Sequence, residues 1–189
     1  LEKYLYIFSE WITAFPSHKI LSVSSNLIKR CLNLKIGSPD KFHTVRSGLN
    51  IEDFLKVRGE GEEIRQKFHL KKHHLVFGTL ARLFKLKGHK YIIQIAGDVV
   101  KEYPNIRFMF IGDGILREEF QDQIRRQNME ENFIFTGLIQ PENVAKYLDS
   151  CDCVIHPSLR EGLPRVIPQA FLLDKPVIAT RVGGGPSVL

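Results

Sequence analysis

The chain has 189 residues, of which 43% are hydrophobic and 25% are charged, proportions that are typical of a folded globular protein and argue against disorder. No apolar run approaches the roughly 20 residues that a membrane-spanning helix needs, so the sequence offers no candidate span. The formal net charge of +6 suits an anionic partner such as nucleic acid, a membrane surface or a phosphate-bearing substrate, although lysines scattered over a solvated surface would give the same total.

The first 15 residues predict a helix that Pro16 ends. Its apolar residues at helical spacing are Leu1, Leu5, Phe8, Ile12 and Phe15. This start has no basic leader region and no small-residue cleavage site, so nothing in it predicts export. The three cysteines, two of them in a C-x-C pair, fit buried free thiols better than a disulfide framework.

A strand is expected over residues 18–23, followed by a helix that Ser24 or Ser25 caps and that runs to about residue 32. Residues 42–46 alternate in the manner of a second strand. The polar stretch that follows, with a short helix over 62–68, predicts a linker and a domain boundary.

From residue 73 onward, strands and helices alternate regularly. The expected strands cover residues 74–80, 106–111, 132–136, 153–156 and 176–180. The expected helices cover residues 90–103, 115–127, 141–149 and 165–173. This alternation predicts an α/β fold, a Rossmann-like parallel sheet with helices on both faces.

Such sheets bind ligands beyond the carboxyl ends of their strands, where four motifs fall. The first runs from Gly78 to Gly88 and places Arg82 and Lys87 directly after a strand. A planar guanidinium and an ammonium at one sheet edge suit a diphosphate, whereas the alternative is two solvated basic residues on a loop.

The second motif is Gly112-Asp113-Gly114, between a strand and a helix. Glycines here allow a tight turn and close approach of the backbone to a ligand. The motif lacks the spacing of the dinucleotide fingerprint G-x-G-x-x-G, so it does not predict NAD binding.

The third motif, residues 156–166, combines a strand end, a glycine turn and a helix start. Uncapped amides at Leu163 to Val166 would favour a phosphate group. Glu161 just before them suits the neutral hydroxyls of a sugar, although a surface glutamate in a loop is the plain alternative.

The fourth motif is the glycine run 183–185 after the last strand. It fits either a loop that approaches a ligand closely or a simple turn before a helix. The sequence leaves both readings open.

Taken in order, these motifs resemble the family-4 (group 1) glycosyltransferases, retaining enzymes of GT-B fold. The steps that match are Gly78, Arg82-Leu83, Lys87-Gly88, Gly112-Asp113-Gly114, Phe135-Thr136-Gly137, Pro157-Ser158, Glu161-Gly162-Leu163-Pro164, Pro176 to Thr180 and Gly183-Gly184. About 110 residues are covered closely. The resemblance implies three parts: residues 1–50 as a remnant of the N-terminal acceptor domain, 51–72 as a linker, and 73–189 as a truncated C-terminal donor domain.

The resemblance also implies roles for individual residues. Arg82 and Lys87 would contact the donor diphosphate and help it leave, and Glu161 would contact the donor sugar. Gln169 stands where the family has a second glutamate, which binds the ribose; an amide can still donate to and accept from a diol. The other residues expected to line the donor site are Gly78, Gly112, Asp113, Gly114, Gly137, Gly162, Leu163, Pro164 and Arg165.

The expected reaction is transfer of a sugar from a nucleoside-diphosphate sugar to a glycan, lipid or other hydroxyl acceptor, with retention of configuration and without a cofactor or metal. The expected location is the cytoplasm, with peripheral contact to the inner membrane face. Two alternatives are a GT-B sugar epimerase and a non-catalytic nucleotide-sugar-binding module, the latter favoured by Gln169. A nucleic-acid role is disfavoured, because no basic stripe is interleaved with aromatic residues.

Overall fold

The computed structural model describes residues 2–188, and its chain divides into two compact units. The first unit consists of Leu1–Gly48, Glu161–Pro164 and Arg181–Leu189, and the second of Leu49–Arg160 and Arg165–Thr180. Residues 51–72, expected to form a linker, therefore belong to the second unit, where α3 (Ile51–Leu55) contacts α8 (Val166–Leu172).

The first unit contains a β–α–β motif that follows helix α1. Its elements are α1 (Glu2–Ala14), β1 (Ile20–Ser22), α2 (Ser25–Asn33), the 3-10 turn η1 (Pro39–Lys41), β2 (Phe42–Thr44) and the 3-10 turn η5 (Gly185–Ser187). β1 and β2 pair in parallel, so α2 is the crossover between them. Ser24 caps α2 by accepting a hydrogen bond from the amide of Leu27, which confirms the helix start read from the sequence.

Helix α1 forms where the apolar spacing predicts it, but the large apolar side chains that this spacing aligns are not buried. Phe8 is 59% exposed and Phe15 is 83% exposed, and the helix also exposes aromatic side chains such as Trp11. Leu1, the first member of the expected stripe, lies outside the described residues. The helical period was therefore predicted correctly, whereas the side chains that it aligns are left without a covering core in this unit.

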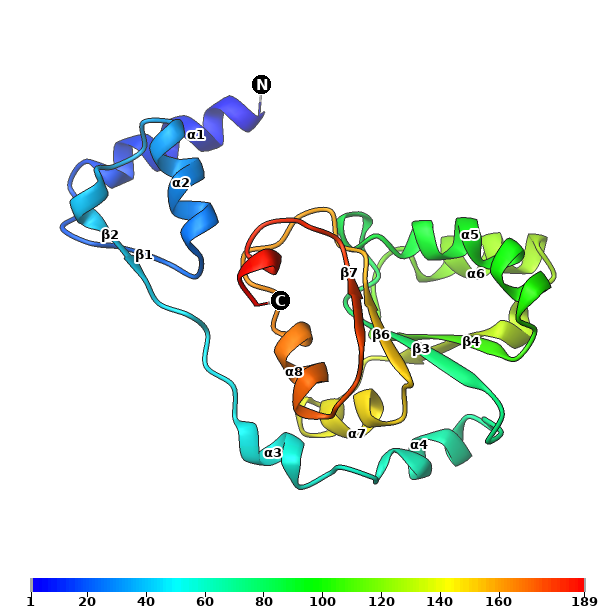
Figure 1. Ribbon diagram of the computed structural model, residues 1–189. Coiled ribbons are helices and arrows are strands. Elements are labelled where there is room, and N and C mark those ends of the chain that lie inside the picture. The colour runs from blue at the N-terminus through cyan, green and yellow to red at the C-terminus, as the bar shows by residue number, and fades with distance from the viewer. Residues whose placement is uncertain (1, 189) are drawn as a thin grey trace. The chain divides into compact units, whose positions relative to one another are not determined.

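The second unit is built on a five-stranded parallel sheet with the order β5-β4-β3-β6-β7 (Figure 1). Its strands are β3 (Leu75–Leu80), β4 (Ile106–Ile111), β5 (Phe133–Gly137), β6 (Cys153–His156) and β7 (Val177–Ala179). Every neighbouring pair is parallel. The predicted α/β class and all five predicted strands are confirmed.

Helices cover the two faces of this sheet (Figure 1). They are α5 (His89–Glu102), α6 (Arg117–Arg126), α7 (Val144–Asp149) and α8, whereas α3 and α4 (Gly61–Lys67) contact α8 and α7. The 3-10 turns of this unit are η2 (Lys85–Lys87), η3 (Glu130–Asn132) and η4 (Pro141–Asn143). α5 and α6 lie on one side, α7 and α8 on the other (Figure 1). The chain leaves β3 toward β4 and later returns on its other side as β6, so the strand order reverses between β3 and β6. Crevices at such reversals are the usual ligand sites of open parallel sheets.

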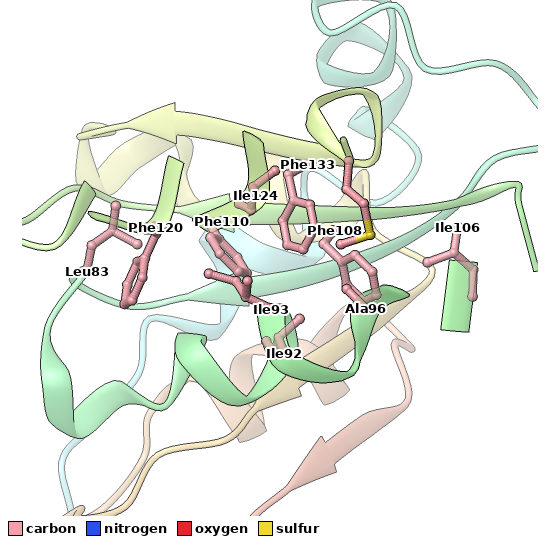
Figure 2. Close-up of a cluster of buried hydrophobic side chains, with 11 residues drawn as sticks. Leu83, Ile92, Ile93, Ala96, Ile106, Phe108, Phe110, Phe120, Ile124 and Phe133 are labelled. Carbon is pink, nitrogen blue, oxygen red and sulfur yellow. The ribbon is translucent and has the colours of Figure 1, made fainter. Parts of the chain in front are cut away.

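A cluster of buried hydrophobic side chains packs β4 and β5 against α5 and α6 (Figure 2). They are Leu83, Ile92, Ile93, Ala96, Ile106, Phe108, Phe110, Phe120, Ile124, Met129 and Phe133. The ring of Phe108 stacks on Phe133 with centroids 5.0 Å apart, and Phe110 meets Phe133 edge to face. This packing fixes the positions of the strand ends that carry the loops described below.

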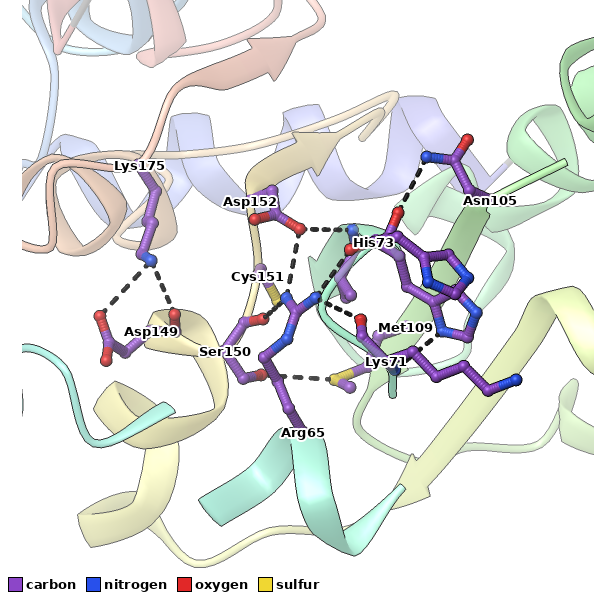
Figure 3. Close-up of polar contacts among 12 residues, drawn as sticks. Arg65, Lys71, His73, Asn105, Met109, Asp149, Ser150, Cys151, Asp152 and Lys175 are labelled. Carbon is purple, nitrogen blue, oxygen red and sulfur yellow. Dashed lines mark hydrogen bonds and ion pairs between the residues drawn. The ribbon is translucent and has the colours of Figure 1, made fainter. Parts of the chain in front are cut away.

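Helix α4 is fastened to the amino-terminal edge of the sheet by Arg65 (Figure 3). The Arg65 guanidinium donates to the carbonyl oxygens of Ser150 and His74 and pairs with Asp152 at 3.2 Å. Asp152 also accepts from the amide of Val76, at 2.7 Å, at the start of β3. Helix α4 is thus held against the segments that precede β3 and β6 within the second unit.

A cavity of about 580 Å³ lies beside this clamp, at the edge opposite to the carboxyl ends of the strands. Its charged lining is largely paired, with Arg58 against Asp174 at 3.1 Å and Lys175 against Asp149 at 3.5 Å. The cavity therefore lies where residues 58–65, part of the expected linker, pack against the rest of the second unit.

The cysteines are free thiols. Cys151 and Cys153 are buried as predicted, whereas Cys31 is partly exposed. Burial raises the pKa of Cys151 to about 12, so this thiol stays protonated. Across residues 2–188, no helix is long and apolar enough to cross a bilayer, and no group of three or more His, Cys, Asp or Glu side chains could hold a metal ion.

Candidate functional site

The loop between β3 and α5 carries both predicted phosphate-binding cations. Arg82 is exposed, and its guanidinium carbon lies 6.0 Å from the ring centroid of Phe84. Lys87 is the last residue of the 3-10 turn η2. The amide of Lys87 donates to the carbonyl oxygen of Phe84 and closes this turn. One short loop at the carboxyl end of a central strand therefore presents a planar and a compact cation.

The Gly112-Asp113-Gly114 turn supports this loop from behind. A Cβ at Gly112 would stand 2.5 Å from the carbonyl oxygen of Ala81, and one at Gly114 would stand 2.5 Å from that of Leu83. The amide of Leu83 donates to the carbonyl oxygen of Asp113 at 3.0 Å. The two glycines thus let the chain pack against the residues on either side of Arg82, and close approach of this turn to a ligand stays a prediction.

Asp113 itself closes its turn and binds a neighbouring helix. Its carboxylate accepts from the amide of Gly114 at 2.8 Å and pairs with Arg117 at 3.0 Å. The Arg117 guanidinium lies over the ring of Phe135. A Cβ at Gly137 would stand 3.4 Å from a nitrogen of this guanidinium. The ends of β4 and β5 are therefore linked, and Gly137 leaves room for Arg117.

The loop after β6 is joined to the cation-bearing loop across the strand-order reversal. Ser158 is fully buried, and its hydroxyl donates to the carbonyl oxygen of Leu86 at 3.1 Å, as does the amide of Leu159 at 2.9 Å. Gly88 has a φ of +79° and lies so close to Pro157 that a Cβ would stand 2.0 Å from its carbonyl oxygen. Only glycine satisfies both conditions, so this contact sets the position of Lys87 directly before it.

Thr180 holds the other side of the same loop. Its hydroxyl donates to the carbonyl oxygen of Ser158 and its amide to that of His156. Sequence reasoning included Ser158 and Thr180 in the motif but gave neither a role. Their signal is a small hydroxyl residue one or two positions after a strand end, where it can bond the adjacent backbone.

The helix after this loop begins one residue later than expected, at Val166, and spans seven residues. Arg165 is its exposed N-cap residue and makes no side-chain capping bond among the described contacts. Gln169 is partly buried on the first turn, and its amide donates to the carbonyl oxygen of Arg165.

Glu161, Gly162, Leu163 and Pro164 belong to the first compact unit, whereas Arg82, Lys87, Arg165 and Gln169 belong to the second. Glu161 is partly buried. The carbonyl oxygen of Gly162 accepts from the amide of Gly184 at 2.9 Å, which joins this segment to the glycine run. A shared donor site formed by Glu161 and the two cations remains a prediction.

Gly78 lies inside β3 and is buried. A Cβ there would stand 2.4 Å from the sulfur of Cys151. Packing of the strand against the end of α7 therefore accounts for glycine at this position without a ligand.

The family model described as glycosyl transferases group 1 matches residues 60–189. An uncharacterised glycosyltransferase of Methanocaldococcus jannaschii is 33% identical over 122 residues, which are 65% of this chain and 30% of that protein. The phosphatidylinositol N-acetylglucosaminyltransferase GPI3 subunit of Saccharomyces cerevisiae is 28% identical over 152 residues, 80% of this chain and 33% of that protein.

Among solved structures, Anabaena HepE in complex with UDP-glucose superposes with a TM-score of 0.88 at 20% identity, over 100% of this chain and 52% of that one. This likeness shows the fold, which is of GT-B type. The chain spans about a third of the length of these two curated relatives. Since the family model covers most of its residues, the chain belongs to the group 1 glycosyltransferases.

Proposed function

We propose that this chain is the donor-binding part of a retaining glycosyltransferase that transfers a sugar from a nucleoside-diphosphate sugar to a hydroxyl acceptor. The observation that carries the proposal is the loop holding Arg82 and Lys87, at the carboxyl end of β3 and beside the strand-order reversal. Two cations on one supported loop match the two negatively charged phosphates of such a donor.

The chemistry assigned to these residues is electrostatic. During transfer the bond between the anomeric carbon and the diphosphate oxygen breaks, and the leaving diphosphate takes the electron pair. Arg82 and Lys87 stabilise the charge that develops there, which accounts for a reaction that proceeds without a metal. The acceptor hydroxyl passes its proton to the departing diphosphate oxygen as its own oxygen bonds to the anomeric carbon, and retention places the new bond on the face that the diphosphate left.

The remaining predicted residues complete the same proposal. Glu161 accepts hydrogen bonds from the hydroxyls of the donor sugar, and Gln169 binds the ribose diol. A UDP-sugar is the first donor to test, because the similar HepE structure is a complex with UDP-glucose.

The three-part division of the chain is also proposed: residues 1–50 from an acceptor-binding domain, 51–72 as the linker and 73–189 as the donor-binding domain. The apolar side chains on α1 and the two-stranded parallel sheet β1–β2 support it, because parallel sheets are normally covered on both faces. The acceptor is a glycan, a lipid or another hydroxyl compound. A cytoplasmic location with peripheral contact to the inner membrane face fits the net charge of +6, which suits an anionic lipid surface.

The donor site is tested first by a thermal-shift screen of UDP-, GDP- and ADP-sugars on the 189-residue chain, followed by calorimetric titration of the best ligand. Arg82→Ala and Lys87→Ala should each weaken binding by about tenfold, as loss of one charge-assisted contact to phosphate predicts. Arg126→Ala and Lys101→Ala, which remove exposed cations from other surfaces of the same unit, should leave the affinity unchanged. Equal affinity in all four variants would contradict the site.

Gln169, at the position where the family has a glutamate, favours a second candidate: a module that binds nucleotide sugar without turnover. The full-length protein, incubated with the labelled donor that the screen identifies, separates the two. Transfer to an acceptor supports the enzyme, whereas binding without turnover supports the module, and release of an epimerised sugar would point to an epimerase.

A further inference from the structure

Three segments that are distant in sequence meet within the first compact unit. They are the first turn of α2, the segment Glu161–Pro164 and the glycine run that begins at Gly183. A Cβ at Gly162 would stand 3.3 Å from the side chain of Val23, so the Glu161 segment packs directly against the start of α2.

The glycine run is fixed against the residues around Glu161 by contacts that tolerate no side chain. Gly183 has a φ of +55°, and a Cβ there would stand 1.9 Å from the carbonyl oxygen of Glu161. A Cβ at Gly184 would stand 2.3 Å from the carbonyl oxygen of Gly162, to which the Gly184 amide donates at 2.9 Å. Of the two readings of this run, the structure supports close approach, with the backbone of Glu161 and Gly162 as the surface approached.

Asn26 holds the outer side of the glycine run. Its side-chain amide donates to the carbonyl oxygen of Gly183 at 2.9 Å. Asn26 is kept in place by α2, because Ser24, which is 2% exposed, caps the helix one residue before its first turn and lies 2.9 Å from a Cβ built at Gly184. The glycine run therefore lies between Asn26, which donates a hydrogen bond to it, and the segment Glu161–Pro164, which it contacts directly.

We propose that Asn26 is a positioning residue for Glu161. Its hydrogen bond orients the Gly183 peptide, which then sets the backbone of Glu161 and the direction in which its carboxylate points. The inference rests on the proposed function in one respect, namely that Glu161 contacts the donor sugar. The bond needs an amide donor, since an aspartate of the same shape can only accept and would repel the Gly183 carbonyl.

Comparing the affinity for a donor with the affinity for its nucleoside diphosphate distinguishes a positioning role of Asn26 from a general loss of structure. The chain is titrated with UDP-glucose and with UDP. If the donor screen selects another nucleotide sugar, that sugar and its nucleoside diphosphate take their place. Asn26→Asp should raise the Kd of UDP-glucose by roughly tenfold and that of UDP by at most about threefold, because Glu161 acts on the sugar alone. Asn33→Asp, which places the same charge at the exposed far end of α2, is the matched control and should change neither Kd.

A double-mutant cycle then connects Asn26 to Glu161. If Asn26 acts through Glu161, adding Asn26→Asp to Glu161→Ala should cost no further affinity for UDP-glucose. Additive losses, or equal losses for UDP and UDP-glucose in the single variant, would overturn the inference.

Amide hydrogen exchange supplies a readout that does not depend on donor binding. The Gly184 amide should exchange at least about tenfold faster in Asn26→Asp and in Asn26→Ala than in the wild type or in Asn33→Asp. A wild-type chain that binds no nucleotide sugar would refute the proposed function, and the exchange rates would still decide whether Asn26 orders the glycine run. Unchanged exchange at Gly184 would refute the positioning role.

Discussion

At the scale of single residues, the structure separates glycines that shape the backbone from residues able to meet a ligand. Gly112, Gly114 and Gly88 are each required by a nearby carbonyl oxygen, and together they set the course of the loop on which Arg82 and Lys87 stand. Substitution of these glycines would therefore act on the cations indirectly, by moving the loop.

His89, directly after Gly88, should make the free energy of unfolding depend on pH. It is fully buried, its ring meets Phe110 edge to face at 4.8 Å, and neither ring nitrogen has a hydrogen-bond partner among the described residues. Burial lowers the pKa of His89 from its ordinary 6.5 to about 4, and the charges of Lys87 and His156 act in the same direction.

Because the folded state disfavours protonated His89, its stabilising contribution is complete above pH 6.5 and is lost as the pH falls toward 4. The loss amounts to about 3 kcal/mol over that window. Replacing His89 with leucine should flatten the fall in the free energy of unfolding by this amount, measured by urea denaturation at several pH values. His69→Gln, which removes an exposed histidine of the same unit, should leave the pH dependence unchanged, and an equally steep profile in His89→Leu would contradict the assignment.

At the scale of secondary-structure elements, helix α4 of the second unit is held in place by long-range polar contacts more than by its own sequence pattern. Helix α4 has seven residues, too few to be stable alone, and it is held by Arg65 and by Lys146, which pairs with Glu60 at 3.1 Å and Glu63 at 3.2 Å. Arg65 is the better buried of the two cations, with 13% of its side chain exposed.

Arg65→Met should lower the free energy of unfolding of the second unit by about 2–4 kcal/mol, because it leaves the partly buried carbonyl oxygens of Ser150 and His74 without this donor and removes the ion pair to Asp152. Arg125→Met is the matched control, since Arg125 also pairs with an aspartate at 3.0 Å but is 65% exposed. The control should cost less than about 1 kcal/mol. Equal losses in chemical denaturation would show that the clamp does not stabilise α4.

At the scale of the whole molecule, the division into two units cuts across the chain. Two returning segments, Glu161–Pro164 and Arg181–Leu189, belong to the first unit although they lie within the sequence of the second. The first passage of the chain from one unit to the other is residues 45–50, which form no helix or strand and are largely exposed.

Trypsin should therefore cut first after Arg46, giving fragments 1–46 and 47–189 by mass spectrometry. The exposed Arg160 and Arg181 lie in loops held by backbone bonds, from Leu159 to Leu86 and from Thr180 to His156, and should be cut later. Arg46→Gln should delay the first cleavage markedly. An early cut after Arg160 in the wild type would contradict the exposure argument.

The sequence by itself determined the α/β class, the five strands of the sheet and the placement of Arg82 and Lys87 after the first of these strands. These features follow from neighbouring residues, because the hydrophobic period, the turn residues and the apolar runs determine the helices and strands. Parallel strands then bring their carboxyl ends to one edge of the sheet. The order of the motifs was also enough to identify the family.

Only the tertiary structure decided what the glycines are for, that Ser158 and Thr180 fasten the loop after β6, and that Asn26 bonds to the glycine run. It also showed that the large apolar side chains aligned along α1 are exposed, which the helical period by itself does not tell. Each of these depends on which distant segments come within a few ångströms of each other. A pattern of neighbouring residues carries no such information, because spacing along the chain fixes the direction of a side chain but not the partner that it meets.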